Sequence, residues 1–187
     1  MLWDNAANKT KTTEKVKFTF KHALAKIGYS VKSKADYDQT TITVTSIKLV
    51  GSENENTKAF YTKGVIDLSK ANGADALWET ASADTKQNFD WFSGNQTLST
   101  EYKPENYLFV IPQDFSGTTT DQLYVVVEYT VKTGESEITN KVSKKITKDF
   151  KQGKAYMINL TIGLTPIEFD ATVNSWGLDN NEDIDLN

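Results

Sequence analysis

Apolar and polar residues alternate with a period of two along most of this chain, and no other feature limits the fold as strongly. That period places the apolar side chains on one face of a half-buried β-strand. The clearest run has five residues on one face, namely Leu123, Val125, Val127, Tyr129 and Val131. The pattern predicts short β-strands from end to end, with helices at most minor.

Two of the predicted strands contain a slip of the inward face by one residue. The first slip lies between Phe20 and Ile27, and the second between Val44 and Ile47. Since such a slip would otherwise turn a strand inside out, we expect a bulge or short turn at each place. Further strands are predicted at residues 58–67, 76–80, 107–111, 123–132, 136–146, 155–164 and 167–173. Residues 107–111 are apolar on both faces, which predicts a central strand covered on both sides.

Turn residues separate the predicted strands. Thr133-Gly134 and Gln152-Gly153-Lys154 each predict a tight reversal, and the first closes a long hairpin. Polar loops are predicted at residues 52–57, 80–88 and 116–121, and short helical turns at 22–26 and 68–72. Many short strands joined by turns indicate an antiparallel β-sandwich. We expect it to span residues 15–177, between an N-terminal arm at 1–14 and an acidic tail at 178–187.

Composition narrows the classes of function. The 187 residues suit one sizeable domain. A net charge of -4, with 21 scattered basic residues that are all lysine, argues against nucleic acid as a partner. The absence of cysteine excludes disulfides and thiol catalysis. No apolar run is long enough to span a membrane, and residues 1–4 lack the features of a signal peptide. If the protein is exported, its leader is expected outside this chain.

The chain has few of the residue types and motifs that catalysis needs, so we expect neither an enzyme nor a cofactor. His22 is the only histidine, which leaves a catalytic triad with one candidate base and a multi-histidine metal site with none. Its neighbours Phe20 and Leu24 predict a packed or hydrogen-bonded structural histidine. No glycine-rich phosphate loop is present. Residues 179–183 space oxygen ligands like a calcium loop, but Ile184 stands where that loop needs glycine. A solvated acidic tail is favoured, with weak calcium binding as the alternative.

Aromatic residues beside carboxylates raise the question of a sugar site. Trp78 precedes Glu79, and Trp91 follows Asp90. Nothing in the spacing sets two carboxyl groups across a gap as glycoside hydrolysis requires, so core or loop packing is the favoured interpretation. A carbohydrate-binding face is the alternative, because flat aromatic surfaces stack on sugar rings. It would need exposed rings side by side, drawn from Trp78, Trp91, Tyr102 or Tyr61.

Several phrases together resemble the fimbrillin-like proteins, the subunits of type V pili in anaerobic gut and oral bacteria. The first is the strand and His-Ala-Leu-Ala-Lys-Ile phrase of residues 16–27. Three more follow in the order typical of the family: 107–113 (Tyr-Leu-Phe-Val-Ile-Pro-Gln), 126–129 (Val-Val-Glu-Tyr) and 153–160 (Gly-Lys-Ala-Tyr-Met-Ile-Asn-Leu). The closing phrase, 167–176, ends in Trp176. The resemblance covers residues 1–176.

The resemblance implies an all-β, transthyretin-like Greek-key sandwich, exported as a lipidated precursor to the cell surface. It also implies assembly in which one subunit donates a strand to the next, where backbone hydrogen bonds supply affinity and alternating side chains supply specificity. Family members usually carry a leader and an N-terminal domain, so this chain is expected to lack its N-terminal part. Edge-strand backbone and the tail residues Leu178, Ile184 and Leu186 are the expected assembly elements.

The predicted function is therefore a structural or adhesive subunit of a bacterial surface fimbria, located outside the cell. Its partners are other fimbrial subunits, with a host glycan or protein as a further partner. The alternative is a surface lipoprotein module on the same sandwich that binds a glycan or host ligand, for which Trp78, Trp91 and Tyr102 are the candidate ligand-facing residues.

Overall fold

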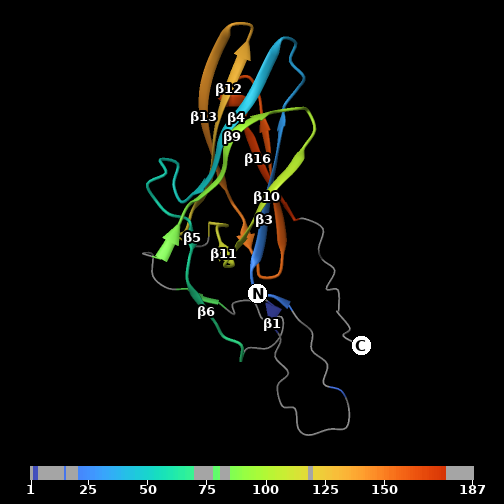
Figure 1. Cartoon of the computed structure of the whole chain (residues 1–187). Helices are drawn as coiled ribbons and strands as arrows, with labels where there is room; N and C mark the ends of the chain where they lie inside the picture. The colour runs from blue at the N-terminus through green and yellow to red at the C-terminus, as the bar shows by residue number, and fades with distance from the viewer. Residues whose placement is uncertain are drawn as a thin grey trace.

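Two four-stranded sheets stacked face to face form the body of the protein (Figure 1). The computed structural model describes residues 2–3, 15, 21–69, 78–80, 85–117 and 120–175. One sheet has the strand order β10-β3-β15-β16 and the other β13-β12-β4-β9. Short two-stranded ribbons, β1-β2, β5-β8, β6-β7 and β11-β14, complete the described part of the chain. The all-β sandwich predicted from the alternation is confirmed.

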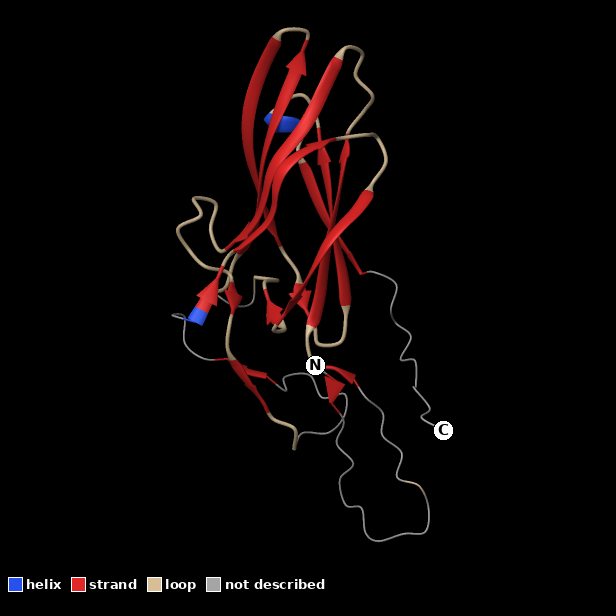
Figure 2. Cartoon of the chain, in the orientation of Figure 1, coloured by secondary structure: helices blue, strands red, loops and turns tan. Residues whose placement is uncertain are grey.

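The strands follow the predicted segments closely in most places. In chain order they are β1 (Leu2–Trp3), β2 (Lys21–His22), β3 (Ala25–Ser33), β4 (Thr40–Val50), β5 (Phe60–Tyr61), β6 (Gly64–Ile66), β7 (Trp78–Thr80), β8 (Lys86–Gln87), β9 (Phe89–Thr97), β10 (Lys103–Val110), β11 (Gln113–Asp114), β12 (Leu123–Thr133), β13 (Ser136–Ile146), β14 (Asp149–Phe150), β15 (Ala155–Ile162) and β16 (Asp170–Ser175). Helical structure is brief, and the 3-10 turn η2 (Pro166–Glu168) lies just before β16 (Figure 2).

The predicted hairpin and bulge are both present. β12 and β13 pair antiparallel along their whole length around Gly134, whose φ of 58° is accessible to glycine without strain. In β4, Val44 pairs with Tyr129 and Ser46 with Glu128, so Thr45 is the extra residue of a bulge. The Thr45 hydroxyl donates to the Glu128 carbonyl at 3.1 Å. The bulge lets Val44 and Ile47 both face the core from one continuous strand.

One pair of strands departs from the predicted antiparallel arrangement. β3 and β15 run parallel at the centre of their sheet. The whole second sheet lies between these strands along the chain, so no hairpin constrains them to be antiparallel. The prediction of an entirely antiparallel sandwich is therefore wrong for this pair.

The predicted helical turn at 22–26 is also wrong. The chain leaves β2 at His22, bends at Leu24 and enters β3 at Ala25. Here the backbone bonds to the distant turn at 151–154 instead of to itself, because Gly153 N donates to Leu24 O and Lys26 N to Lys154 O. That bend supplies the break expected between Phe20 and Ile27. His22 is exposed, so of the two predicted roles, a packed or a hydrogen-bonded structural histidine, the packed one is wrong.

Two strand predictions fail near the middle of the chain. β9 was not predicted, because after Phe89 and Trp91 the alternation breaks and its pairing with β4 shifts register twice. Residues 107–111 were expected at the centre of a sheet, but among the described residues β10 is an edge strand that pairs with β3 alone. Its outward residues are apolar without being covered. The last predicted strand, 167–173, begins instead at Asp170, after η2.

Aromatic side chains fill the end of the core nearest the short ribbons. Phe60 contacts Phe89 and Phe115 at ring-centroid distances of 5.2 and 5.5 Å. Phe115 contacts Phe150 edge-to-face at a centroid distance of 6.0 Å, and Phe150 contacts Tyr156 in the same way at 4.9 Å. Edge-to-face pairs of this kind favour one fixed arrangement of the rings. The ribbons β5-β8 and β11-β14 are thus tied to the sandwich through its core.

Several predictions fall outside the described residues. They include the strand pattern of residues 16–20, the arm at 1–14, the tail at 178–187 with its calcium-like spacing, and part of the turn at 68–72. The domain limits at 15 and 177 stay predictions for the same reason.

Candidate assembly edge and ligand-facing surface

Each of the two large sheets ends in two edge strands, and such edges are where a further strand can add. β10 and β16 bound one sheet, and β13 and β9 bound the other. β13 and β16 lie on the same side of the sandwich, where Lys144 of β13 pairs with Asp170 of β16. β9 and β10 therefore lie together on the opposite side. The four edges differ greatly in what they offer a partner.

Three edges carry features that discourage strand addition. β13 presents Lys141, Lys144 and Lys145, all exposed, and charged side chains at an edge oppose pairing. β16 is only six residues long, with Thr172 and Asn174 exposed. β9 shifts register twice against β4, and an irregular strand offers a partner few consecutive hydrogen bonds.

β10 is the edge with exposed aromatic side chains. Leu108 and Val110 face the core, while Tyr107 and Phe109 face outward with exposed fractions of 39% and 61%. Tyr107 to Val110 pair with β3 in unbroken register, and a register shift separates them from Pro104. Natural edge strands are usually protected by charge, proline or shortness. The stretch from Tyr107 to Val110 carries neither charge nor proline and is the candidate assembly edge.

The Tyr107 ring lies across the outer face of the sheet because Gly28 leaves room for it. A Cβ at Gly28 would come within 2.6 Å of Tyr107 Cε1 and 3.2 Å of Met157 Cε. The Lys26 ammonium lies 4.2 Å from the Tyr107 ring centroid. The ring thus covers Met157, which is buried although the register places it on the outer face.

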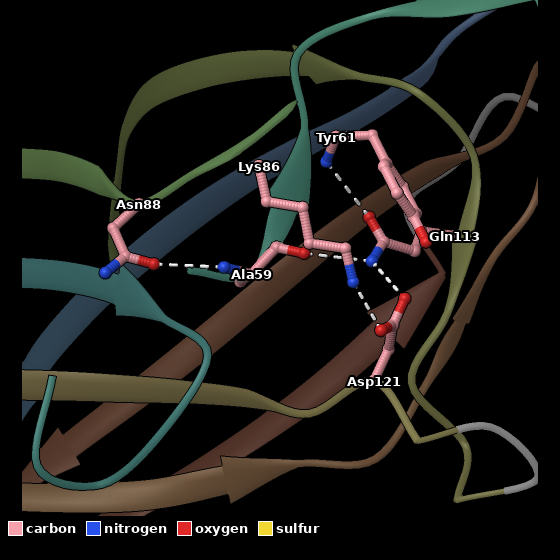
Figure 3. A network of polar contacts seen from close by, with 6 residues as sticks. All are labelled: Ala59, Tyr61, Lys86, Asn88, Gln113 and Asp121. Carbon is pink, nitrogen blue, oxygen red and sulfur yellow. Dashed lines mark hydrogen bonds and ion pairs between the residues drawn. The ribbon is translucent and has the colours of Figure 1, made fainter. Parts of the chain in front are cut away.

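A network of polar contacts holds the chain just beyond β10 (Figure 3). Gln113 Nε2 donates to the Ala59 carbonyl at 2.9 Å, and Gln113 Oε1 accepts from Tyr61 N at 3.4 Å. Asn88 Oδ1 accepts from Ala59 N at 3.0 Å. One buried glutamine therefore substitutes for strand pairing at the start of β5, which satisfies backbone groups that burial would otherwise leave unpaired.

An ion pair completes this network. Lys86 Nζ pairs with Asp121 Oδ1, and Gln113 Nε2 donates to Asp121 Oδ2 at 2.7 Å. The Lys86 ammonium also lies 4.4 Å from the centroid of the Tyr61 ring. Both charged side chains are largely withdrawn from water, so the contacts are screened less than those of a surface pair. We call Lys86, Gln113 and Asp121 the polar clasp.

The loop at 51–57 covers part of the outer face of the second sheet. Glu55 reaches Lys48 Nζ of β4 at 2.9 Å and also pairs with Lys141 of β13. Hydrogen bonds from Lys141 and Lys48 hold the pKa of the Glu55 carboxyl below its ordinary value of 4.5. Val126 is buried although it points away from the core, since the loop lies over it. This part of the face is therefore covered by the protein's own loop.

The aromatic platform, which was the alternative interpretation, is not formed: Trp91 is a core residue, as the favoured interpretation predicted, and its assignment as a ligand-facing residue is wrong. Trp91 is only 5% exposed and packs edge-to-face on Tyr29 at 4.8 Å. β9 turns this side chain between the sheets, where no ligand can stack on it. Its Nε1 is buried without a hydrogen-bond partner among the described residues. The hypothesis of a flat, exposed aromatic surface must therefore exclude this residue.

Trp78 and Tyr102 are far apart. Trp78 is half-buried and its Nε1 donates to the Ala23 carbonyl at 2.6 Å, next to the first residue of β3. Tyr102 is 40% exposed and lies by Lys32, near the last residue of β3. β3 is nine residues long, so its two ends lie roughly 26 Å apart at about 3.3 Å per residue. Tyr61, the remaining candidate, belongs to the polar clasp region.

Sequence reasoning missed Tyr107 and Phe109 as surface residues. Pro104 was the available signal, because a proline inside a strand favours an edge position. The tail residues Leu178, Ile184 and Leu186 lie outside the described residues. Within the described ranges, no group of three or more histidine and carboxylate side chains is placed to hold a metal ion. The same ranges contain no helix of the length and apolarity needed to cross a membrane.

The fold of this chain is similar to that of a fimbrial protein of known structure. A fimbrial protein from Bacteroides vulgatus matches with 23% identity and a TM-score of 0.58, over 86% of this chain and 56% of that one. A proposed cell adhesion protein from Parabacteroides distasonis matches with 12% identity and a TM-score of 0.49, over 84% and 53%. The chain thus spans little more than half the length of these structures. No curated protein matches it.

The family model of the fimbrillin-like proteins matches residues 1–176, which is nearly the whole chain. That match includes the strands of both sheets and the phrases from which the resemblance was first drawn. The chain belongs to the fimbrillin-like family.

Proposed function

We propose that this chain is part of a structural and adhesive subunit of a bacterial surface fimbria, which assembles by strand donation between subunits. Membership of the fimbrillin-like family and the shared fold with a Bacteroides fimbrial protein support this function. The subunit acts outside the cell, its partners are other fimbrial subunits, and its role is not enzymatic. The exposed apolar edge of β10 is the single observation that carries the assembly step.

The acceptor for the donated strand is the free edge of β10. A strand laid beside Tyr107 to Val110 gains backbone hydrogen bonds from groups that β3 does not use. Its outward side chains cover Phe109, and its inward ones reach the core between β9 and β10. Trp91 Nε1 is a buried donor on that side without an acceptor among the described residues. An incoming strand that supplied an oxygen there would offset the desolvation of this group.

The donor segment is the tail that contains Leu178, Ile184 and Leu186. Ile184 and Leu186 share one parity, so both would point to the same side of an added strand. Replacing both by aspartate in the full-length subunit should prevent it from acting as donor while leaving its acceptor edge intact. Mixed with wild-type subunits, this variant should be found only at one end of a filament.

The acceptor edge is tested by Phe109→Lys in the full-length subunit, expressed in a strain that lacks the wild-type gene. A lysine at an edge opposes strand addition, so few or no filaments should be seen by immunogold electron microscopy. Ile138→Lys is the matched control, since Ile138 is an equally exposed apolar residue on the edge strand β13. Normal filaments from Phe109→Lys, or loss of filaments from both variants, would show that β10 is not the acceptor.

A further inference from the structure

The outer face of the β10-β3-β15 sheet carries the same local arrangement twice. Tyr107 lies over Gly28 with the Lys26 ammonium 4.2 Å from its ring centroid. Tyr102 has the Lys32 ammonium 4.5 Å from its ring centroid and shares a 2.9 Å hydrogen bond with the Thr161 hydroxyl. We call these the two tyrosine–lysine pairs.

Strand register places both pairs on one face. Lys26, Gly28 and Lys32 alternate with the core residues of β3, so all three point outward. Gly28 is paired with Tyr107 on one side, and Lys32 with Thr161 on the other. Four residues of β3 separate Gly28 from Lys32, which is about 13 Å along the strand. A single ligand in contact with both pairs must therefore be extended.

The surface between the two pairs is polar and ordered. Ser30 and Asn159 are partners in adjacent strands, and the Ser30 hydroxyl donates to Asn159 Oδ1 at 2.7 Å. Ser30 is buried and Asn159 is half-buried. The face thus presents aromatic, polar and again aromatic surface along one line. A sheet face of this kind differs from the β10 edge, because it offers ring surfaces and amide groups in place of free backbone.

Lysine side chains lie at both ends of this face. Lys26 and Lys32 each supply an ammonium beside a ring. Asp170, which the register places next to Thr161, is already paired with Lys144. An aromatic ring stacks on the apolar face of a sugar, and the adjoining ammonium attracts an acid group on it. A neutral sugar would use only half of each pair.

We propose that this outer face binds an extended anionic oligosaccharide, with its sugar rings on the two tyrosines and its carboxylate or sulfate groups near the two lysines. The proposal deepens the adhesive part of the proposed function and names its ligand class. It does not depend on strand donation, because the binding face and the β10 backbone edge are distinct. Loss of filaments and loss of sugar binding are therefore separate results.

The whole chain should be tested by biolayer interferometry against immobilised hyaluronan, polygalacturonate and polysialic acid, with dextran of similar length as the neutral control. We expect binding to at least one anionic polymer and none to dextran. The affinity should fall as NaCl is raised from about 0.05 to 0.5 M, because exposed charges are screened. Failure of all three anionic polymers, or equal binding of dextran, would overturn the proposal.

Variants test whether the two pairs are responsible. Tyr102→Ala and Lys32→Gln should each weaken binding about two- to fivefold, the range of an exposed cation–aromatic contact. Tyr102→Phe keeps the ring and should bind nearly as well as the wild type. Tyr124→Ala and Lys145→Gln, on the other sheet, are the matched controls and should have no effect. Unchanged binding by Tyr102→Ala and Lys32→Gln would contradict the proposal, provided that their thermal unfolding matches the wild type.

Discussion

Tyr107 and Gly28 are packed so closely that any other residue at position 28 would collide with the ring. A Cβ there would lie 2.6 and 2.7 Å from two ring carbons. The contact couples the edge strand β10 to the centre of its sheet, and it keeps Met157 covered on a face that is otherwise open. The acceptor edge and the proposed sugar-binding face thus share one tyrosine.

Gly28→Ala should destabilise the protein by about 1–3 kcal/mol, as is typical when an extra carbon is forced into a packed site. The measurement is urea unfolding followed by tryptophan fluorescence. In a Tyr107→Ala background the same change should cost little, because the ring that it strikes is gone. An equal cost in both backgrounds would show that the contact with Tyr107 is not the cause.

Asp121→Asn should lower the free energy of unfolding by about 1–3 kcal/mol, because it leaves the largely buried Lys86 ammonium without its counter-charge. The amide can still accept the hydrogen bond from Gln113. Asp149→Asn is the control, since its 3.9 Å pair with Lys151 is exposed and such pairs contribute roughly 0–1 kcal/mol. If both variants have the same midpoint of urea unfolding, the polar clasp adds no more stability than a surface pair.

Glu55 should make stability depend on pH in the acidic range. Its pKa is lowered in the folded protein by Lys141 and Lys48, so the unfolded chain binds a proton at higher pH than the folded one. The stabilisation is complete above the pKa that Glu55 has in the unfolded chain, and it is lost as pH falls through the lower pKa of the folded protein. Glu55→Gln should be less stable than the wild type at pH 7, with a smaller further loss below about pH 4.5. Urea midpoints across pH 3 to 7 measure this.

The control for that pH series is Glu135→Gln, at the exposed turn of the β12–β13 hairpin. It should follow the wild-type curve throughout. A Glu55→Gln curve parallel to that of the wild type would show that the loop at 51–57 is not held by this carboxylate.

Trp91→Ala should cost about 3–5 kcal/mol, the range for removing a large aromatic side chain from a core. Trp91→Phe should cost much less, because it keeps most of the packing on Tyr29 and removes the buried Nε1 donor, which has no partner among the described residues. Chemical denaturation of both variants checks this. A mild effect of the alanine variant would mean that Trp91 is not a core residue in solution.

Period-two alternation was enough to locate most strands. It placed β13 at its observed limits, β12 and β15 to within two residues, and the bulge in β4 between Val44 and Ile47, where the structure has Thr45 as the extra residue. These features are local, because the pattern of inward and outward residues depends on each strand and its immediate partner. β9 was not predicted from the alternation, because its alternation is broken where its pairing with β4 shifts register.

The error over β10 has a different origin. Tyr107, Leu108 and Phe109 are as apolar as a central strand requires, yet the outward two are exposed at an edge. Whether an apolar outward residue is covered depends on what lies beyond the strand, and periodicity carries no information about that. The same limit explains why Trp78, Trp91 and Tyr102 could be proposed together and are found in three separate surroundings.

The sequence by itself determined the all-β class, the strand periodicity, the two glycine turns and the lack of the residue types on which thiol and histidine chemistry depend. Only the tertiary structure decided which strands are edges, that β3 and β15 run parallel, and that two tyrosines from the β10 side lie beside lysines of β3. The physical reason is that alternation sets the direction of each side chain through local backbone geometry. Neighbours across a sheet are instead chosen by the packing of segments far apart in the chain.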